Sequence, residues 1–403
     1  MSGATTLSVA SALLKEIYEP PLQDQLQSEV LTLKRIEKST QGISHEVGGK
    51  YVTFPIRVRR NHGIGARLEN EALPDARSQK YVSVRVALKY LYGAISITGQ
   101  TMNLAKTNPQ AFVNAMDEEV KGLRESLVKD INRQVYGTNA GKLATIPTGS
   151  GSSGVDHTVT SAQYLEEGMV VDIRTSAGAL VASKIIIEEV DQDTNVVTFD
   201  TAFDSTDGDF MTRHGSYNKE KTGFEQMVSN SGTLFEVDPN TVPLWKSHVE
   251  SNSGTPRALS EGIMIKVADK VRTKGGKTTV IFTTLGVRRS YFALLQQQRQ
   301  IVNTKKFDGG FEGLSFTTDA GEIPVMADFD CQKGRMYFMN EKDIKLYQAG
   351  EWSFMNEDGS NWQRVMNSQG KFDAYEAMMF KYCEMGLHRR NTHALLTDIQ
   401  EAE

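Results

Sequence analysis

The sequence predicts a mixed α+β fold built from several units, and three patterns carry that prediction. Residues Tyr51 to Arg59 and Lys80 to Leu91 alternate apolar and polar side chains, which indicates two strands joined by a long polar segment. Residues 109 to 136 place apolar side chains every three or four positions, which indicates one long helix. After residue 148, short strand patterns give way to alternating helices and strands.

Length and composition place the chain among ordinary globular proteins. With 403 residues it is long enough for more than one domain, since domains run to about 100–200 residues. Hydrophobic residues make up 39% and charged residues 24%, as expected for a folded chain. The 45 Lys and Arg against 50 Asp and Glu give a net charge of −5, which argues against a dedicated nucleic-acid binder.

Cysteine usage and hydropathy limit the cellular compartments in which the protein is expected. Cys331 and Cys383 lie far apart without metal-binding neighbours, which predicts two reduced, packed thiols. No apolar run approaches the roughly 20 residues of a membrane helix, and the N-terminus lacks a signal pattern. We therefore expect a protein that stays in the cytoplasm in which it is made.

The first fifty residues predict an arm. Ser8 to Tyr18 and Asp24 to Ile36 have helical spacing of apolar side chains, and Pro20 and Pro21 separate them. Ser39 to Gly49 is polar and predicts a connection. Short helices cannot bury their apolar faces alone, so the arm must pack on something else.

The segment from Tyr51 to Lys89 is basic within an acidic chain, with eight basic residues against three acidic ones. The bases are Arg57, Arg59, Arg60, Arg67, Arg77, Lys80, Arg85 and Lys89, and the acids are Glu69, Glu71 and Asp75. An isolated hairpin is at best marginally stable in water. A long charged hairpin therefore needs support, and a neighbouring subunit is the natural candidate.

The helix at 109–136 is expected to be about 42 Å long at 1.5 Å per residue, more than twice the average. Asn108 is the expected N-cap, Pro109 the first helical residue and Gly137 the end. Its polar face is rich in acids, namely Asp117, Glu118, Glu119, Glu125 and Asp130.

Beyond this helix the chain predicts a small β-domain and then an α/β unit. The composition of the Gly/Ser-rich tract from Thr148 to Gly154 predicts a linker. The predicted strands of the β-domain are Met169 to Arg174, Lys184 to Val190, Val196 to Asp200 and Asp209 to Arg213. The α/β unit and C-terminal region are predicted as a helix at Leu259 to Lys274, a strand at Thr278 to Thr283, a helix at Leu285 to Gln298 and a strand at Lys371 to Gly386.

Catalytic and cofactor motifs are incomplete. Lys274 to Thr279 resembles a phosphate loop, but Val271 stands where glycine is required, so a turn is the better interpretation. Gly63 and Gly65 would need a third glycine where Leu68 stands. We therefore expect neither catalytic residues nor a cofactor site.

Metal and anion motifs are equally weak. Asp191 to Asn195 imitates the start of a calcium loop, but Val196 and Ala202 replace the required glycine and glutamate, which favours a hairpin turn. The seven histidines form no helical pair at metal spacing, so no metal site is expected. His388 to Arg390 could touch nucleic acid or an anionic neighbour, although a solvated chain end is commoner.

The order of these parts resembles the major capsid proteins of tailed bacteriophages, whose fold is the Hong Kong 97 type. Four groups of residues carry the resemblance besides the order: Gly168 to Ile173 with Val190 to Val197; Gly223 to Val228 with Gly232 to Pro239 and Trp245; Ile281 to Thr284 with Tyr291, Leu294 and Leu295; and Ile323 to Val325 with Gly334 to Met339. The resemblance spans nearly the whole chain.

The resemblance implies seven segments. They are an N-terminal arm (1–50), an extended two-stranded loop (51–90), a peripheral domain with a long spine helix (91–138), an inserted small β-domain (139–223), a return of the peripheral domain (224–258), an axial α/β domain (259–345) and the C-terminal strands of the peripheral domain (346–403).

In such proteins the extended loop of one subunit lies over the peripheral domain of a neighbour, and the charges here agree with that arrangement. The expected intersubunit residues are Arg57, Arg59, Arg60, Arg67 and Arg77 on the loop and Glu118, Glu119 and Glu125 on the spine helix. Exposed ion pairs contribute only about 0–1 kcal/mol each, so these charges would set register more than strength.

The resemblance also implies partners and location. The subunit would self-assemble into hexamers and pentamers around double-stranded DNA, without sequence-specific binding, and the shell would expand when DNA is packaged. A portal protein at one vertex and a decoration protein are further implied partners, with no membrane. Because an arm of about fifty residues is short for a built-in scaffold, a separate scaffolding protein is expected. Assembly would occur in the host bacterial cytoplasm and the product would be the virion.

Two other functions remain open. An encapsulin-like cytoplasmic compartment would use the same fold to store an enzyme cargo, which would co-purify in place of DNA. A polyanion-binding protein would use the basic loop as a monomer, and its DNA affinity would fall steeply with salt.

Some related capsid subunits join a loop lysine to an asparagine by an isopeptide bond, and this sequence predicts that no such bond forms. The loop between Tyr51 and Gln79 contains no lysine; only Lys50 and Lys80 stand at its base. Assembled shells that are denatured without reductant should therefore migrate as one monomer band on a gel. A ladder of covalent oligomers would contradict the prediction.

Overall fold

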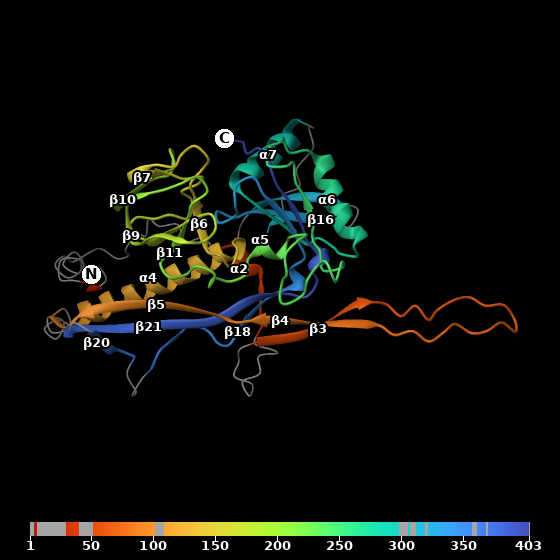
Figure 1. The fold of residues 1–403 in the computed structure, drawn as a ribbon, viewed down its shortest axis with the longest axis horizontal. Coiled ribbons are helices and arrows are strands. Elements are labelled where there is room, and N and C mark those ends of the chain that lie inside the picture. The colour runs from red at the N-terminus through yellow and green to blue at the C-terminus, as the bar shows by residue number, and fades with distance from the viewer. Residues whose placement is uncertain are drawn as a thin grey trace. The chain divides into compact units, whose positions relative to one another are not determined.

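The computed structural model of the chain describes residues 4–5, 30–39, 51–100, 109–297, 305–306, 312–318, 321–356, 361–367 and 370–402 (Figure 1). The described residues fall into two compact units. One unit contains those up to Val30, with Leu88–Asn132 and Gln348–Cys383. The other contains those of Leu31–Ala87, Arg133–Tyr347 and Glu384–Glu403. No helix in the described ranges is long and apolar enough to cross a membrane.

The first unit is built on a long antiparallel strand pair. β21 (Gly370–Leu387) pairs with β5 (Lys89–Thr98) from Ala374 opposite Thr98 to Cys383 opposite Lys89. Three short strands extend this sheet: β1 (Ala4–Thr5) beside β5, and β19 (Ser353–Phe354) and β20 (Gln363–Asn367) beside β21. The predicted strand at Lys371 to Gly386 is thus confirmed and is slightly longer than expected.

The long helix α4 (Pro109–Tyr136) has the predicted bounds and packs on this sheet. A side chain added at Gly93 of β5 would lie less than 3 Å from methyl groups of Leu123 and Leu127. The missing side chain therefore lets the helix approach the strand closely. The expected N-cap, Asn108, lies outside the described residues.

The N-terminal predictions were only partly correct. Between Val30 and Ser39, only α2 (Thr32–Arg35) is helical, and β2 (Glu37–Ser39) follows it. β2 pairs in parallel with β18 (Ile344–Gln348), so Ser39 belongs to a strand instead of a connection. The strand is specified by a partner some 300 residues away, which local patterns cannot show. The predicted helix at Ser8 to Tyr18 lies outside the described residues.

The predicted strand at Lys80 to Leu91 is two strands. β4 (Lys80–Ala87) pairs with β3 (Tyr51–Arg59) in a hairpin, and after Leu88 the chain continues as β5 in the first unit. Alternation continues across the break, so the sequence could not reveal the change of partner.

Residues 142–213 form a six-stranded antiparallel sheet in the second unit. Its order is β6 (Lys142–Thr145), β11 (Phe210–Arg213), β8 (Val170–Arg174), β9 (Leu180–Asp191), β10 (Val196–Asp204) and β7 (Ser153–Thr158). All four predicted strands are present, and residues 191–196 form the predicted hairpin turn. The linker prediction was wrong at its end, because Ser153 and Gly154 are the first residues of β7. They pair with Asp204 and Phe203 of β10.

A mixed sheet of seven strands, within the described residues, forms the other large core of the second unit. Its order is β12 (His248–Glu250), β22 (Ala394–Leu396), β17 (Met336–Met339), β13 (Val280–Thr283), β16 (Gly321–Ala327), β15 (Glu312–Thr318) and β14 (Lys305–Lys306). Both predicted helices, α6 (Glu261–Thr273) and α7 (Leu285–Gln297), pack on it through residues such as Val267 and Tyr291. Ser260 caps α6 by accepting a hydrogen bond from the Ile263 amide.

Both cysteines are buried thiols without a disulfide, as predicted. Burial, reinforced by Asp328, raises the pKa of the Cys331 thiol well above its ordinary value. The thiol therefore stays protonated at neutral pH, which suits a packing role.

Arg390 is not part of a solvated chain end; it is a buried cation of the second unit. Its side chain is 1% exposed, and its guanidinium donates hydrogen bonds to five backbone carbonyl oxygens at 3.0–3.3 Å. These carbonyls belong to Gln226, Met227, Ser231, Gly232 and Trp245. Burial lowers the pKa of Arg390 to about 10, which leaves it charged at neutral pH. Arg390 thus ties the loop between α5 (Phe224–Met227) and β12 to the C-terminal segment.

Replacing Arg390 should strongly destabilise the protein. In Arg390→Met several buried carbonyls lose their donor, at about 1–3 kcal/mol each, so the free energy of unfolding should fall by at least about 3 kcal/mol. Urea unfolding of the purified subunit measures this. The adjacent Arg389→Met is the matched control, because Arg389 is exposed and donates to the carbonyl of Gly275. Equal destabilisation by both substitutions would contradict the assignment.

His393 should make stability depend on pH. It is fully buried beside β22, accepts a hydrogen bond from the Asn340 amide at Nδ1, and burial lowers its pKa to about 3. The unfolded chain therefore binds the proton first, and the stabilisation present above about pH 6.5 is lost progressively as pH falls toward 3. Between pH 7 and 5.5 this residue alone should remove about 1 kcal/mol.

The substitution His393→Asn keeps an acceptor for the Asn340 amide but cannot titrate, so it should flatten the pH dependence by that amount. Urea midpoints measured from pH 7 to 5.5 provide the test. His62→Asn, at an exposed histidine of the hairpin, is the matched control for replacing one histidine by asparagine. An unchanged slope in His393→Asn would show that other groups control it.

Candidate functional site

The β3–β4 hairpin carries most of the predicted contact residues. Its strands pair from Tyr51 opposite Ala87 to Arg59 opposite Lys80, and residues 60–79 continue as a long irregular loop (Figure 1). The valines at its base, Val52, Val84 and Val86, are buried, whereas the arginines toward its tip are exposed. The sequence therefore fixes one end of the hairpin by burial and leaves the other end in solvent.

Large apolar side chains are exposed in the loop at the tip of the hairpin. Ile64, Leu68 and Leu73 are 80%, 77% and 82% exposed. The loop is held by local bonds: Arg67 Nε donates to the Ala72 carbonyl at 2.7 Å, and the Leu68 amide donates to Glu71 at 2.9 Å. Several exposed apolar side chains on an ordered loop are typical of a surface that a partner covers.

The base of the hairpin is anchored to the rest of its unit. Phe54 stacks on His388 with ring centroids 4.5 Å apart, and His388 Nε2 lies 2.7 Å from the Tyr347 hydroxyl. On the partner strand, the Arg85 amide donates to the Phe235 carbonyl, and the Arg85 guanidinium lies 3.6 Å from Glu236. Burial lowers the pKa of His388, and the positive charge of the nearby Lys345 lowers it further. This ring is therefore neutral at physiological pH and packs as an aromatic.

A groove of about 680 Å³ lies beside β3, and we call it the basic groove. Residues 54–60 form one side of it, and the other lining residues are Val242, Leu244, Trp245, Lys274, Gly275, Asp343, His388, Arg389 and Asn391. Among the described residues its charged members are five cations, namely Arg57, Arg59, Arg60, Lys274 and Arg389, and one carboxylate, that of Asp343.

The carboxylate of Asp343 can offset only one of these five positive charges, and neutral donors hold it in place. Asp343 accepts hydrogen bonds at 2.7 Å from Asn340 and from Thr392. Burial, together with Lys246 and Lys270, lowers the pKa of Lys274, whose ammonium donates to the Lys246 carbonyl. The groove is therefore electrostatically suited to a negatively charged partner.

The groove also exposes the edge of a strand. In the described part of the chain β3 pairs with β4 alone, and seven consecutive residues around its second half line the groove. An unpaired strand edge offers backbone donors and acceptors to an extended segment.

The structure brings together part of the predicted contact set. Arg57, Arg59 and Arg60 line the basic groove, while Arg67 and Arg77 are exposed on the loop beyond it. On α4, Glu125 is exposed and Glu119 is half-buried. Glu118 lies in the part of α4 whose side chains are outside the description.

Sequence reasoning missed the other cations of the groove. Lys274 was assigned to a turn, correctly, and Arg389 to a chain end, but nothing in their spacing links them to residues 57–60. Among the described residues, no group of three or more His, Cys, Asp or Glu side chains is placed to hold a metal ion.

Comparison with known proteins identifies the family. The model of the SU10 major capsid protein family matches residues 14–400. The fold is similar to that in the capsid asymmetric unit of cyanophage A-1(L), with a TM-score of 0.58, 14% identity and coverage of 98% of both chains. No curated protein sequence matches the chain.

Two further structural matches have TM-scores below 0.5 and add nothing to the assignment. A structure of Mycobacterium phage Bobi has 7% identity, coverage of 98% of this chain and 99% of that chain, and a TM-score of 0.49. The encapsulin of Synechococcus elongatus has 8% identity, coverage of 97% and 95%, and a TM-score of 0.43.

The family match extends over nearly the whole chain, and the mixed helix and sheet fold agrees with it. The resemblance inferred from the sequence is thus confirmed, and the protein is a structural, shell-forming subunit of a bacteriophage icosahedral capsid. The chain belongs to the SU10 major capsid protein family.

Proposed function

We propose that this subunit assembles into hexamers and pentamers by laying its β3–β4 hairpin over a neighbouring subunit. The single observation that carries the proposal is the exposed hairpin end, where Ile64, Leu68 and Leu73 are about four-fifths exposed beside exposed arginines. Such a loop leaves apolar surface exposed to water, which is unfavourable, unless a partner covers it. A neighbouring copy of the same chain is the partner that a closed shell supplies.

Charge complementarity supports the acidic face of α4 as the receiving surface. Arg57, Arg59, Arg60, Arg67 and Arg77 are all exposed, and Glu125 on α4 is exposed as well. Each exposed pair contributes about 0–1 kcal/mol, so a few pairs fix the register of the hairpin while the apolar tip supplies most of the affinity.

The parts of the chain take the following roles in this proposal. Residues 1–50 are an arm, 51–90 the extended loop, and 91–138, 224–258 and 346–403 the peripheral domain with α4 as its spine. Residues 139–223 are an inserted β-domain and 259–345 the axial domain. The six-stranded sheet of residues 142–213 and the sheet bearing α6 and α7 support this division, because each has its own apolar core.

The proposed partners follow from a shell that encloses a genome. They are a separate scaffolding protein during assembly in the host bacterial cytoplasm, a portal protein at one vertex, a decoration protein, and double-stranded DNA held without sequence recognition. Packaging of DNA would then expand the shell. An outer shell around DNA needs no strong positive field, which agrees with the net charge of −5.

The basic groove favours one second function, which is contact with a polyanion. Five cations around one strand edge would bind nucleic-acid phosphates through a charge interaction that weakens steeply with salt. A DNA-binding assay across salt concentrations tests this role, because affinity should fall steeply as salt rises. Shells that form in the absence of nucleic acid would instead favour the intersubunit role.

A charge swap tests the hairpin contact. Arg59→Glu with Arg60→Glu should lower shell yield, and Glu119→Arg with Glu125→Arg should do the same, because each removes two complementary pairs worth together about a factor of 10 in association. Combining all four substitutions should restore shells. Negative-stain electron microscopy and sedimentation across subunit concentrations measure the yield.

Lys333→Glu is the matched control, since Lys333 is exposed and lies outside the hairpin and the groove. It should leave the yield unchanged. If the fourfold variant assembles no better than either double variant, the arginines and the acidic face of α4 are not partners.

A further inference from the structure

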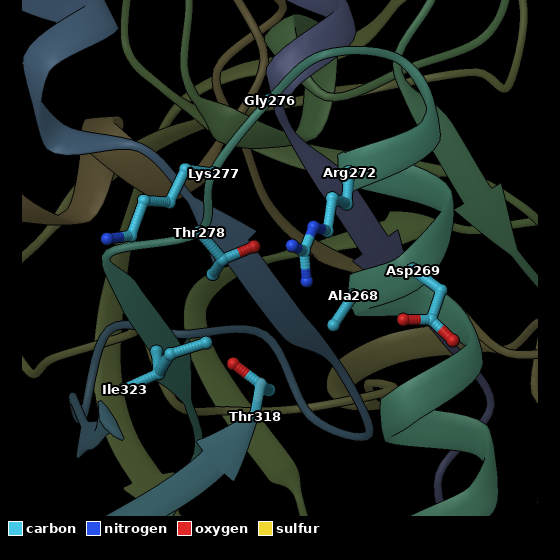
Figure 2. Close-up of a pocket in the computed structure, with 8 residues that line it drawn as sticks. All are labelled: Ala268, Asp269, Arg272, Gly276, Lys277, Thr278, Thr318 and Ile323. Atoms are coloured by element: carbon cyan, nitrogen blue, oxygen red, sulfur yellow. The ribbon is translucent and has the colours of Figure 1, made fainter. Parts of the chain in front are cut away.

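A second, smaller pocket lies at the end of α6, outside the basic groove (Figure 2). Its volume is about 280 Å³. The last turns of α6 contribute Asp269 and Arg272, the turn after it contributes Lys277 and Thr278, and the end of β15 contributes Thr318. We call it the turn pocket. It belongs to the segment that resembles a phosphate loop in sequence but lacks the first glycine of that motif.

The backbone that shapes the turn pocket is held rigidly. The Gly275 amide donates to the Arg272 carbonyl at 2.8 Å and the Gly276 amide to the Val271 carbonyl at 3.0 Å, which closes the C-terminus of α6. Gly275 has φ of +79°, and a side chain at Gly276 would come within 2.8 Å of Val271 and Thr392. The two glycines are therefore required by geometry, and they fix where Thr278 points.

Thr278 carries an unsatisfied group into this pocket. Its side chain is 6% exposed, yet within the described ranges its hydroxyl has no hydrogen-bond partner. The next residue contrasts with it, because the Thr279 hydroxyl contacts Met339 and Glu341. A buried hydroxyl without a partner is costly, so a site that keeps one invites a ligand. Figure 2 shows the Thr278 oxygen directed toward the side of the pocket where the Arg272 guanidinium lies.

The lining groups specify a ligand with two kinds of oxygen. Arg272 donates only, and a guanidinium pairs best with an oxyanion. The Thr318 hydroxyl already donates to the Gly321 carbonyl at 3.1 Å, so it can only accept, and the carboxylate of Asp269 is likewise an acceptor when ionised. The ligand must therefore offer anionic oxygens to Arg272 and Thr278 and a hydroxyl proton to Thr318 or Asp269.

We propose that the turn pocket is a binding site for inorganic phosphate in a protonated form. Hydrogen phosphate carries both P–O⁻ and P–OH groups, whereas sulfate at neutral pH carries no proton. Arg272 and Thr278 hold the anionic oxygens, and Asp269 and Thr318 select for the hydroxyl. This goes beyond shell formation, because no residue of the pocket is among those proposed to meet a neighbour.

Calorimetric titration of inorganic phosphate into the unassembled full-length subunit, with ionic strength held constant by sodium chloride, tests the site. Saturable binding of about one phosphate per subunit is expected. Arg272→Gln should weaken it about tenfold or more through loss of a charge-assisted hydrogen bond. Arg288→Gln, at an exposed arginine on α7 outside the pocket, is the matched control and should leave it unchanged.

Thr278→Val separates a ligand site from a structural role. It removes the unpartnered hydroxyl, so the melting temperature without phosphate should stay the same or rise while phosphate affinity falls. A lower melting temperature with unchanged affinity would overturn the role of Thr278. Absence of saturable binding to the wild type, unchanged affinity in Arg272→Gln, or equal binding of sulfate would each overturn the proposal.

Discussion

The second unit depends on one buried cation. The guanidinium of Arg390 donates to two carbonyl oxygens of α5 and three of the loop between α5 and β12, and the Ser247 hydroxyl donates back to the Arg390 carbonyl at 2.7 Å. That loop has little regular structure to satisfy its own carbonyls, so a planar donor that reaches several of them replaces a helix or sheet. The same loop supplies Val242, Leu244 and Trp245 to the basic groove. Arg390 therefore holds one wall of the groove without touching its contents.

The hairpin presents the opposite situation, since its far end is held by local hydrogen bonds and is exposed among the described residues. Its base is secured by the Phe54–His388 stack and the Arg85–Phe235 bond, but its tip exposes three large apolar residues. A subunit that must join many copies of itself needs a surface that is ordered before assembly and satisfied only afterwards. The hairpin suits the contact proposed for it, because local bonds around Arg67 order its loop while Ile64, Leu68 and Leu73 stay exposed among the described residues.

The turn after α6 divides two basic sites of different character. Lys274 and Gly275 face the basic groove, whereas Gly276 to Thr278 face the turn pocket. The groove is larger, has a strand edge without a partner in the part of the chain that the structure describes, and suits an extended anionic segment. The pocket is smaller, has a fixed backbone and suits a single small anion. Gly276 packs closely against Thr392, so a side chain there would disturb the backbone of the turn.

The sequence alone determined the parts of this protein that depend on local periodicity. The bounds of α4 and of the hairpin strand β3, and the presence of the four central strands of the six-stranded sheet, follow from repeats of 3.6 and 2 residues. The order of these parts indicated the capsid family. Tertiary structure decided what depends on distant partners: β2 exists because β18 pairs with it, and β4 and β5 separate because each has a different neighbour. Arg390 is buried, and Lys274 and Arg389 join the loop arginines, for the same reason. The type and spacing of residues indicate which side of a helix or strand is apolar. Only the folded chain shows which distant residues pack against that side.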